Sequence, residues 1–303
     1  MDKAIKDHFK TFLESQKFDA IAFGKVDFTK NIYDSFQIEK LGSVLYENEP
    51  AIYFDLASLS KPLNNGIAYL IEEDNITKEM QLVLNHRGGL PAWGLLPKNG
   101  WEDIINSFEI KESETLYSDY SALRFMLEFN KLFPQGMQNK VKKYWDREVL
   151  FWKDLSKERT VQNGFIKGKP NRACVHDPNA YNLNTYVSHA GLFGTIEGVC
   201  KTLINLNEQF KLVSKMHKLM HKEHPRFVNG WDTVTNPADT LAGNGCGPHT
   251  FGHLGFTGTS IWIDSEQKLG YVLLTNATKS YWFDKAELND FRKNLGEKIW
   301  QSS

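Results

Sequence analysis

The chain has 303 residues, of which 41% are hydrophobic, so it can bury a sizeable core in two lobes or one large α/β body. Its 36 Lys and Arg residues balance 37 Asp and Glu residues, and no basic run carries interleaved aromatic side chains. This composition argues against nucleic acid or an anionic membrane surface as a partner.

Targeting and redox signals are weak. Residues 1–8 lack the apolar stretch of a secretory signal, and no later segment has membrane-spanning length. We therefore expect no membrane span and a cytoplasmic location, or a periplasmic one if a signal peptide has been removed; the oligomeric state stays open. Cys174, Cys200 and Cys246 are odd in number and widely spaced, which indicates reduced, structural residues.

The predicted elements change in type along the chain. An amphipathic helix over 3–16 precedes strands at 20–26 and 32–41. The following region is dominated by helical patterns, at 62–73, 77–85, 100–108, 119–132, 137–154 and 196–209. Strands return at 227–231, 256–263 and 269–275, and a helix over 284–300 closes the chain.

This order predicts a two-lobed α+β fold. One five-stranded antiparallel sheet would be assembled from both ends of the chain and flanked by the N- and C-terminal helices, with an all-helical lobe inserted. The expected division is 1–60 and 211–303 for the sheet lobe and 61–210 for the helical lobe. Clefts between lobes often hold small-molecule sites, so we expect the active site at the boundary between them.

A serine and a lysine lie three residues apart in the segment 54–63, where a strand leads into a helix. On the first helical turn Ser58 and Lys61 would share a face and touch, which places a nucleophile beside a group able to take its proton. A capping serine with a solvated lysine is the plain alternative. The other such pair, Ser265 and Lys268, lies between two apolar runs and is interpreted as a polar hairpin turn.

Two further segments carry groups that complement this pair. Tyr117 precedes a helix that Ser118 or Asp119 would cap, and a nearby Lys61 ammonium would lower the pKa of its phenol from about 10. Around His253 the glycine-rich segment 251–260 leads into an apolar strand, whose backbone N–H groups would face a developing oxyanion. Each segment alone also has an ordinary structural explanation.

In this order the three motifs resemble those of the penicillin-recognising serine hydrolases: Ser58-x-x-Lys61, Tyr117-Ser118-Asp119 and His253-Leu254-Gly255. The chain is most similar to the class C branch, which includes β-lactamases, D-alanyl-D-alanine peptidases and esterases. The segments 84–91, 175–180 and 189–193 extend the resemblance over most of the chain from about residue 50 to 276.

The resemblance implies roles for these residues. Ser58 would be the acylated nucleophile, Lys61 its activating amine and Tyr117 the general acid and base. The backbone N–H groups of Ser58 and Phe256 would form the oxyanion hole. The remaining motif residues, Asp119, His253, Leu254 and Gly255, would contact a small-molecule or short-peptide acyl substrate.

Two departures from the family pattern bear on the substrate. Members that act on penicillins or D-Ala-D-Ala usually carry Lys and then Thr or Ser where this chain has His253 and Leu254, which weakens the anchor for a substrate carboxylate. Asp119 replaces the amide of Asn with a negative charge, a form that resembles esterase-like members. We therefore favour an esterase-like serine hydrolase acting on a small acyl ester or amide.

Three alternatives remain. One is a D-Ala-D-Ala carboxypeptidase or β-lactamase-type enzyme, and another is a non-catalytic relative that binds a peptide or cell-wall fragment. A metal hydrolase is the third, because His217, His221 and His224 share a helical face and His249 and His253 are spaced by four residues. Lysines surround the first set and no carboxylate ligand is evident, so we expect neither a metal nor a cofactor.

Overall fold

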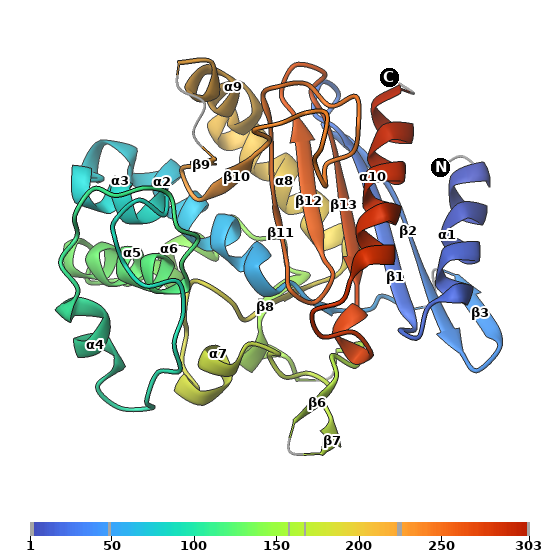
Figure 1. The fold of residues 1–303 in the computed structure, drawn as a ribbon, viewed down its shortest axis with the longest axis horizontal. Coiled ribbons are helices and arrows are strands. Elements are labelled where there is room, and N and C mark those ends of the chain that lie inside the picture. The colour runs from blue at the N-terminus through green and yellow to red at the C-terminus, as the bar shows by residue number, and fades with distance from the viewer. Residues whose placement is uncertain (1–2, 48–49, 157, 167, 223–225, 302–303) are drawn as a thin grey trace.

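The computed structural model describes residues 3–47, 50–156, 158–166, 168–222 and 226–301. Its largest element is an eight-stranded antiparallel sheet in the order β3-β2-β1-β13-β12-β11-β10-β9, so strands from both ends of the chain lie side by side (Figure 1). The strands are β1 Ala20–Asp27, β2 Ile32–Leu41, β3 Val44–Glu47, β9 Phe227–Val228, β10 Trp231–Thr233, β11 Thr250–Leu254, β12 Ser260–Asp264 and β13 Leu269–Thr275.

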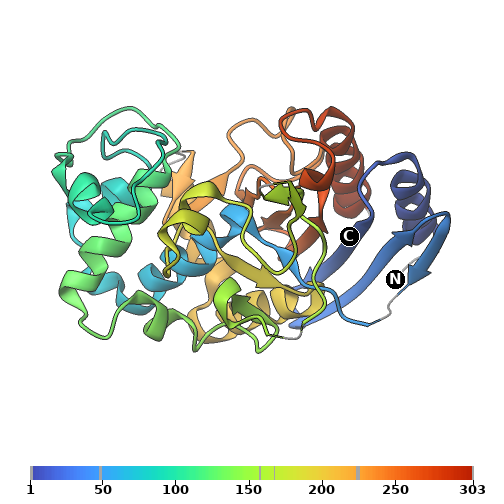
Figure 2. The same cartoon turned by 90° about the horizontal axis from the view of Figure 1, so that it is seen from below.

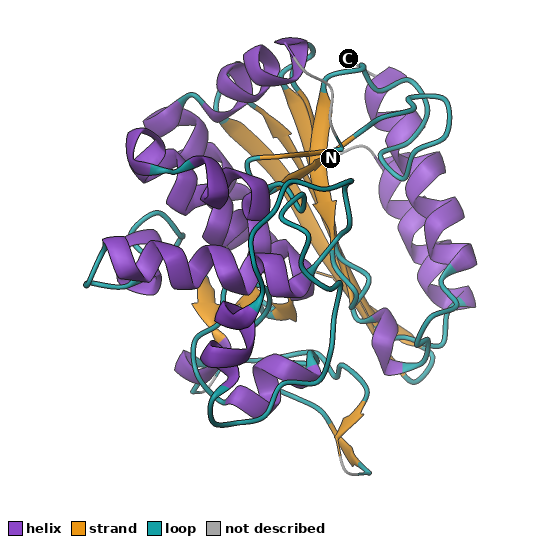
Figure 3. Cartoon of the chain, turned by 60° about the vertical axis from the view of Figure 1, so that its left-hand side comes forward, coloured by secondary structure: helices purple, strands orange, loops and turns teal. Residues whose placement is uncertain are grey.

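Helices cover both faces of this sheet (Figure 3). Successive side chains of a strand point to opposite faces, and β1 shows this clearly. Its Ile21 and Phe23 pack in one core with the terminal helices α1 Lys3–Ser15 and α10 Ala286–Gln301. Its Ala20 and Ala22 belong to the second core, which also contains α8 Ile196–Phe210. Apolar burial on both faces therefore holds the two ends of the chain together.

The segment between β3 and α8 forms most of the remainder of the molecule, on the left in Figure 1. Its α-helices are α2 Ile67–Glu72, α3 Lys78–Leu84, α4 Trp101–Ser107, α5 Asp119–Leu132, α6 Met137–Val141 and α7 Pro178–Leu183; α9 Leu212–Lys222 follows α8. A small sheet joins β4 Phe54–Asp55, β8 Leu192–Gly194 and β5 Val149–Phe151, and β6 Phe165–Ile166 pairs with β7 Lys169–Pro170. Seen from below, this part and the sheet form one continuous body (Figure 2).

The predicted α+β architecture is confirmed, but the sheet has more than the five expected strands. One predicted strand at 227–231 is split into β9 and β10 by Asn229 and Gly230, which both have positive φ angles. The short β3 and the strand β11 were missed. The helix predicted over 137–154 ends at Val141, and residues 149–151 form β5 instead.

The remaining predictions concern helix α8, the cysteines and membrane-spanning segments. The helix α8, which the sequence analysis placed in the helical lobe, packs against β1, β2 and β13. Gly24 permits this close approach, because a Cβ there would clash with Cys200 of α8. All three cysteines are free thiols. No helix in the described part of the chain is long and apolar enough to cross a membrane.

Candidate active site

Ser58 lies in a tight helical turn directly after β4. Residues Ala57–Leu59 form a 3-10 turn, and a π-helical segment over Pro62–Gly66 continues into α2. Pro62 has no backbone N–H, so this turn cannot make the regular α-helical hydrogen bond there. The predicted contact is present: Lys61 Nζ lies 3.0 Å from Ser58 Oγ. Ser58 is partly accessible, whereas Lys61 is only 1% exposed.

The backbone before Ser58 is held in an unusual conformation. Ala57 has a φ angle of +47°, in the region that side chains with a Cβ disfavour. The buried carboxyl of Asp55 accepts hydrogen bonds from the N–H groups of Ala57 (2.8 Å) and His176 (2.7 Å). Burial raises the pKa of Asp55 to about 7, although both hydrogen bonds favour its ionised form. Asp55 thus fixes the turn that presents Ser58.

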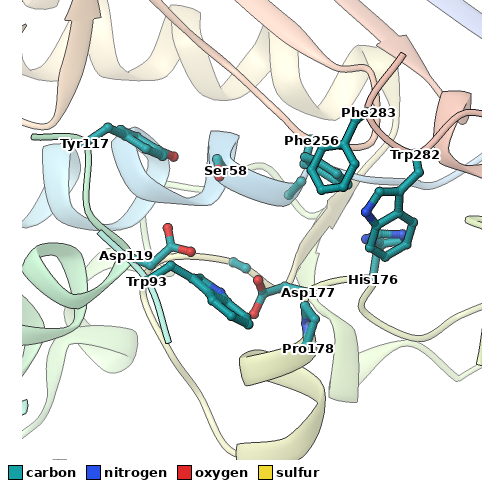
Figure 4. Close-up of a pocket in the computed structure, with 12 residues that line it drawn as sticks. Ser58, Trp93, Tyr117, Asp119, His176, Asp177, Pro178, Phe256, Trp282 and Phe283 are labelled. Atoms are coloured by element: carbon teal, nitrogen blue, oxygen red, sulfur yellow. The ribbon is translucent and has the colours of Figure 1, made fainter. Parts of the chain in front are cut away.

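Tyr117 is positioned from the loop 84–91. The N–H of Leu116 donates to His86 O (2.9 Å), the N–H of Ser118 donates to His86 Nδ1 (3.2 Å), and Ser118 Oγ donates to Pro91 O (2.6 Å). Ser118 is the N-cap of α5, since its Oγ accepts from the N–H of Ser121. The phenol oxygen of Tyr117 points toward Ser58 (Figure 4). The loop and the helix cap together set this orientation.

Lys61 is a buried cation with several partners. Its Nζ lies 2.7 Å from Asp119 Oδ1, donates to His189 O at 3.2 Å and lies 4.9 Å from the centre of the Tyr117 ring. Burial alone would lower the pKa of Lys61, but attraction to Asp119 and Tyr117, with their hydrogen bonds, raises it above its ordinary value. Lys61 is therefore an ammonium in the resting site.

The expected lowering of the Tyr117 pKa is wrong. Burial raises the pKa of this phenol. The charge of Lys61 lowers the pKa, as predicted, but the charge of Asp119 raises it. The prediction included the effect of the Lys61 ammonium on this pKa, but neither the desolvation of the phenol nor the charge of Asp119. In the resting site, Tyr117 is consequently a neutral phenol.

A second hydrogen-bonded pair of titratable side chains lies beside Lys61. Asp177, the N-cap of α7, is 2.9 Å from His189 Nε2. Burial alone would raise the pKa of Asp177, but the charge of His189 and the hydrogen bond to it lower this pKa to about 2. Asp119, Asp177 and His189 lie close enough to share a metal ion, yet the Lys61 ammonium already supplies a cation to Asp119.

The third motif lies at the end of β11, before a turn, and not at the start of a strand over 256–263 as predicted. The N–H of Gly255 donates to Thr259 O (2.8 Å), which closes this turn. His253 Nδ1 bonds Leu254 O at 2.8 Å, and its ring lies 5.8 Å from that of Tyr117. Burial and the Lys61 charge lower the pKa of His253 to about 3, so the imidazole is neutral.

The two residues of the candidate oxyanion hole lie at the pocket beside Ser58. Ser58 and Phe256 line the same pocket. The N–H of Ser58 belongs to the first turn of a helix, where backbone donors lack intrahelical acceptors. Within the described residues, the N–H of Phe256 has no backbone acceptor. Both donors are thus available to a ligand.

The pocket beside Ser58 has a volume of about 460 Å³ and is mainly aromatic and apolar. Trp93 lies at one side, and Phe256, Trp282 and Phe283 lie at the other, with His176 beneath Trp282 (Figure 4). Trp93 is 51% exposed and Phe283 80% exposed, so these rings present apolar surface to solvent.

Several residues of this site had no predicted role. His86, Asp177 and His189 lie in the segments 84–91, 175–180 and 189–193, so the family resemblance contained a signal for them. Asp55 precedes Ser58 in sequence, but nothing in the pattern shows that its carboxyl turns back onto the chain. Trp282 and Phe283 had no signal, because tertiary packing alone brings their loop to the pocket.

Comparisons with known proteins agree with this geometry. The Beta-lactamase family model matches residues 135–291, just over half of the chain. A protein of Escherichia coli O157:H7 named "Putative D-alanyl-D-alanine carboxypeptidase" is 34% identical over 257 residues, covering 65% of this chain and 56% of that protein. The protein of the same name in E. coli K12 is 33% identical over 257 residues and gives the same coverage of both chains. The chain thus spans just over half the length of these curated relatives.

Solved structures show the same fold. The class C beta-lactamase of Rhodobacter sphaeroides superposes with a TM-score of 0.66 at 14% identity, covering 97% of this chain and 99% of that one. A simvastatin synthase mutant from Aspergillus terreus has a TM-score of 0.66 at 11% identity, covering 98% and 94%. With the family match and the site geometry, these findings establish that the chain belongs to the beta-lactamase family, a family of penicillin-recognising serine hydrolases.

Proposed function

We propose that this protein is a serine hydrolase that forms an acyl-enzyme on Ser58 and acts on an uncharged ester or amide with an apolar acyl group. The observation that carries the proposal is the 3.0 Å contact between Ser58 Oγ and a buried Lys61, next to Tyr117 in an accessible pocket. A nucleophile beside a group that relays its proton is the arrangement that acyl transfer requires.

The proposed reaction follows from these positions. The Lys61–Tyr117 pair first loses one proton to solvent. Ser58 Oγ then attacks the substrate carbonyl and gives its own proton to this pair. Tyr117 then protonates the leaving group, and the acyl group stays on Ser58. The N–H groups of Ser58 and Phe256 stabilise the negative oxygen of the tetrahedral intermediate. A water molecule, activated by the same pair, releases the acid and restores Ser58.

The preference for an uncharged substrate is supported by the charges around Ser58. Asp119 contributes a carboxylate, and His253 stays neutral because its pKa is about 3. Neither group attracts a substrate carboxylate. The aromatic pocket instead matches an apolar acyl chain, since each buried methylene group contributes about 0.8 kcal/mol.

One observation favours a second candidate, a peptidase acting on a substrate with a free carboxylate. A neighbouring cavity of about 350 Å³ is lined by Ser58 and His253 and also by Lys285 and Arg292. However, Arg292 already donates to Thr259 O (3.1 Å) and Asn289 Oδ1 (2.9 Å), and Lys285 lies over the Phe256 ring. We place this candidate second because these cations already have partners.

A substrate panel separates the two candidates. Nitrophenyl esters of increasing chain length, D-alanyl-D-alanine peptides and a β-lactam would be tested with the wild type, Ser58→Ala and Arg292→Lys. The first proposal predicts ester turnover that Ser58→Ala abolishes and Arg292→Lys leaves nearly unchanged. Turnover restricted to the peptides, with a loss in Arg292→Lys, would favour the second candidate. A lack of turnover with every substrate would favour a non-catalytic binding role.

A further inference from the structure

A cluster of imidazoles lies at the start of β11, the end of that strand opposite His253. His217 and His221 come from α9, His249 immediately precedes β11, and Glu266 lies in the turn between β12 and β13. One ligand atom each of His217, His249 and Glu266 lies within 4.8 Å of the others. The His221 ring is centred 5.4 Å from that of His249. Three separate segments thus bring nitrogen and oxygen ligands together.

The hydrogen bonds fix which nitrogen of His217 is available. Ser265 Oγ donates its only proton to His249 O at 2.7 Å, so it accepts at 3.0 Å from His217 Nδ1–H. The neutral His217 ring therefore carries its lone pair on Nε2. Glu266 Oε1 lies 2.7 Å from His249 Nδ1, so the carboxylate and this imidazole are already in contact. Metal-binding histidines are commonly oriented through the second ring nitrogen in this way.

A buried carboxylate ties together the two loops that carry these ligands. Asp264, which is fully buried, accepts at Oδ2 from the N–H of Gly247 (2.7 Å), two residues before His249. Its Oδ1 accepts from the N–H groups of Glu266 (2.9 Å) and Gln267 (3.0 Å). The cluster thus rests on a prearranged scaffold, from which the 45% exposed Glu266 side chain extends.

One of the two reasons for expecting no metal here, the missing carboxylate, is wrong. A carboxylate is present, because tertiary packing brings Glu266 from the β12–β13 hairpin to the histidines of α9. Of the nearby lysines, Lys215 is engaged by Glu73. His224 lies outside the described residues, and His253 lies at the other end of β11, about 13 Å away at the usual rise per residue.

We propose that His217, His249 and Glu266 bind a divalent transition-metal ion, Zn²⁺ by preference, with His221 as the nearest further ligand. Imidazole nitrogens with one carboxylate oxygen suit zinc, which takes such ligands at about 2.0–2.2 Å. The ion would link α9 to β11 and to the β12–β13 hairpin, which lie at one end of the sheet (Figure 1). Its role is structural, since these ligands lie outside the pocket beside Ser58.

The test uses the complete, untagged chain after removal of metal with a chelator. Zn²⁺ would be added by equilibrium dialysis, with bound zinc measured by elemental analysis and the Tm measured with and without zinc. We expect one ion per chain, a Kd on the order of micromolar or tighter, and a higher Tm with zinc, because a ligand that binds only the folded state stabilises it. Co²⁺ should give the visible absorption of a tetrahedral site.

Variants of Glu266, His217 and His221 locate the ion, and His8→Gln is the control. Glu266→Gln keeps the shape of the side chain but removes its charge, and His221→Ala alters an exposed position, so both should fold. Glu266→Gln should weaken zinc binding at least tenfold, and His217→Ala should abolish the Tm shift. His8→Gln, which removes an imidazole outside the cluster, should leave both unchanged.

Two results would overturn the proposal: a wild-type Kd in the millimolar range, which marks adventitious binding, or an unchanged zinc content in both Glu266→Gln and His217→Ala. Ester hydrolysis by Ser58 should be equal with and without zinc. The tests of the metal site and of the proposed hydrolase activity therefore have independent outcomes.

Discussion

At the scale of a single residue, Lys61 shows how burial and a neighbouring carboxylate together determine whether a side chain is protonated. A lysine that is only 1% exposed would normally lose its proton, yet the Asp119 carboxylate 2.7 Å away keeps it charged. The same carboxylate also raises the pKa of Tyr117. One side chain thus sets the protonation of both groups that are proposed to move protons.

Removing the charge of Asp119 should change the pH dependence of kcat/KM. In Asp119→Asn the pKa values of Lys61 and Tyr117 should both fall, because the carboxylate that favours their protonated forms is gone. Activity requires loss of a proton from this pair, so kcat/KM should rise with pH in the wild type, and the rise should shift to lower pH in the variant. Steady-state ester hydrolysis across the pH range measures this. Superimposable profiles would contradict the role given to Asp119.

Asp55 gives a prediction for stability. Its pKa in the folded chain is about 7, above that of the unfolded chain, so the stability it contributes is present at acid pH and is lost as the pH rises from about 4 to 7. Asp55→Asn cannot ionise, so the free energy of unfolding of the wild type, relative to that of this variant, should decline over this range. Each pKa unit corresponds to about 1.4 kcal/mol, which makes the decline a few kcal/mol.

Urea denaturation of both proteins at several pH values would measure this decline. Asp74→Asn, at an exposed position, is the control and should show a constant difference from the wild type. If the difference between the wild type and Asp55→Asn is equally constant, folding does not raise the pKa of Asp55, which would contradict this prediction.

At the scale of elements, loops without regular structure complete the pocket. The loop between α3 and α4 brings Trp93 to it, and the loop before α10 brings Trp282 and Phe283. Hydrophobic periodicity cannot place such segments, since they follow no repeat. The same limit explains why the helix predicted over 137–154 is wrong, because a short, mostly buried strand such as β5 shows an apolar run like that of a helix.

The pocket predicts a chain-length preference. Trp93→Ala should lower kcat/KM for long-chain nitrophenyl esters relative to the acetyl ester by about tenfold, because it removes apolar surface that a longer chain would cover. Leu95→Ala changes a more exposed residue in the same loop, 66% exposed and outside the pocket, and serves as the control. Equal losses for short and long esters in Trp93→Ala would mean that the acyl group lies elsewhere.

At the scale of the whole molecule, the order of elements and the spacing of motifs were sufficient to predict the architecture. Terminal strands that flank a helical region imply a sheet built from both chain ends, and β1 and β13 do lie side by side. The contact between Ser58 and Lys61 was predictable because it is local. The pairing of Asp177 with His189 and the place of Glu266 depend on tertiary contacts, which a sequence pattern does not encode.

The central claim, an acyl-enzyme on Ser58, is tested most directly by mass spectrometry of the intact protein and of its peptides. After treatment with a fluorophosphonate, the account predicts one adduct per chain, on the peptide that contains Ser58. Ser58→Ala, with an unchanged circular dichroism spectrum, should show no adduct and no ester turnover. An adduct on another serine, or turnover by Ser58→Ala at the wild-type rate, would contradict the account.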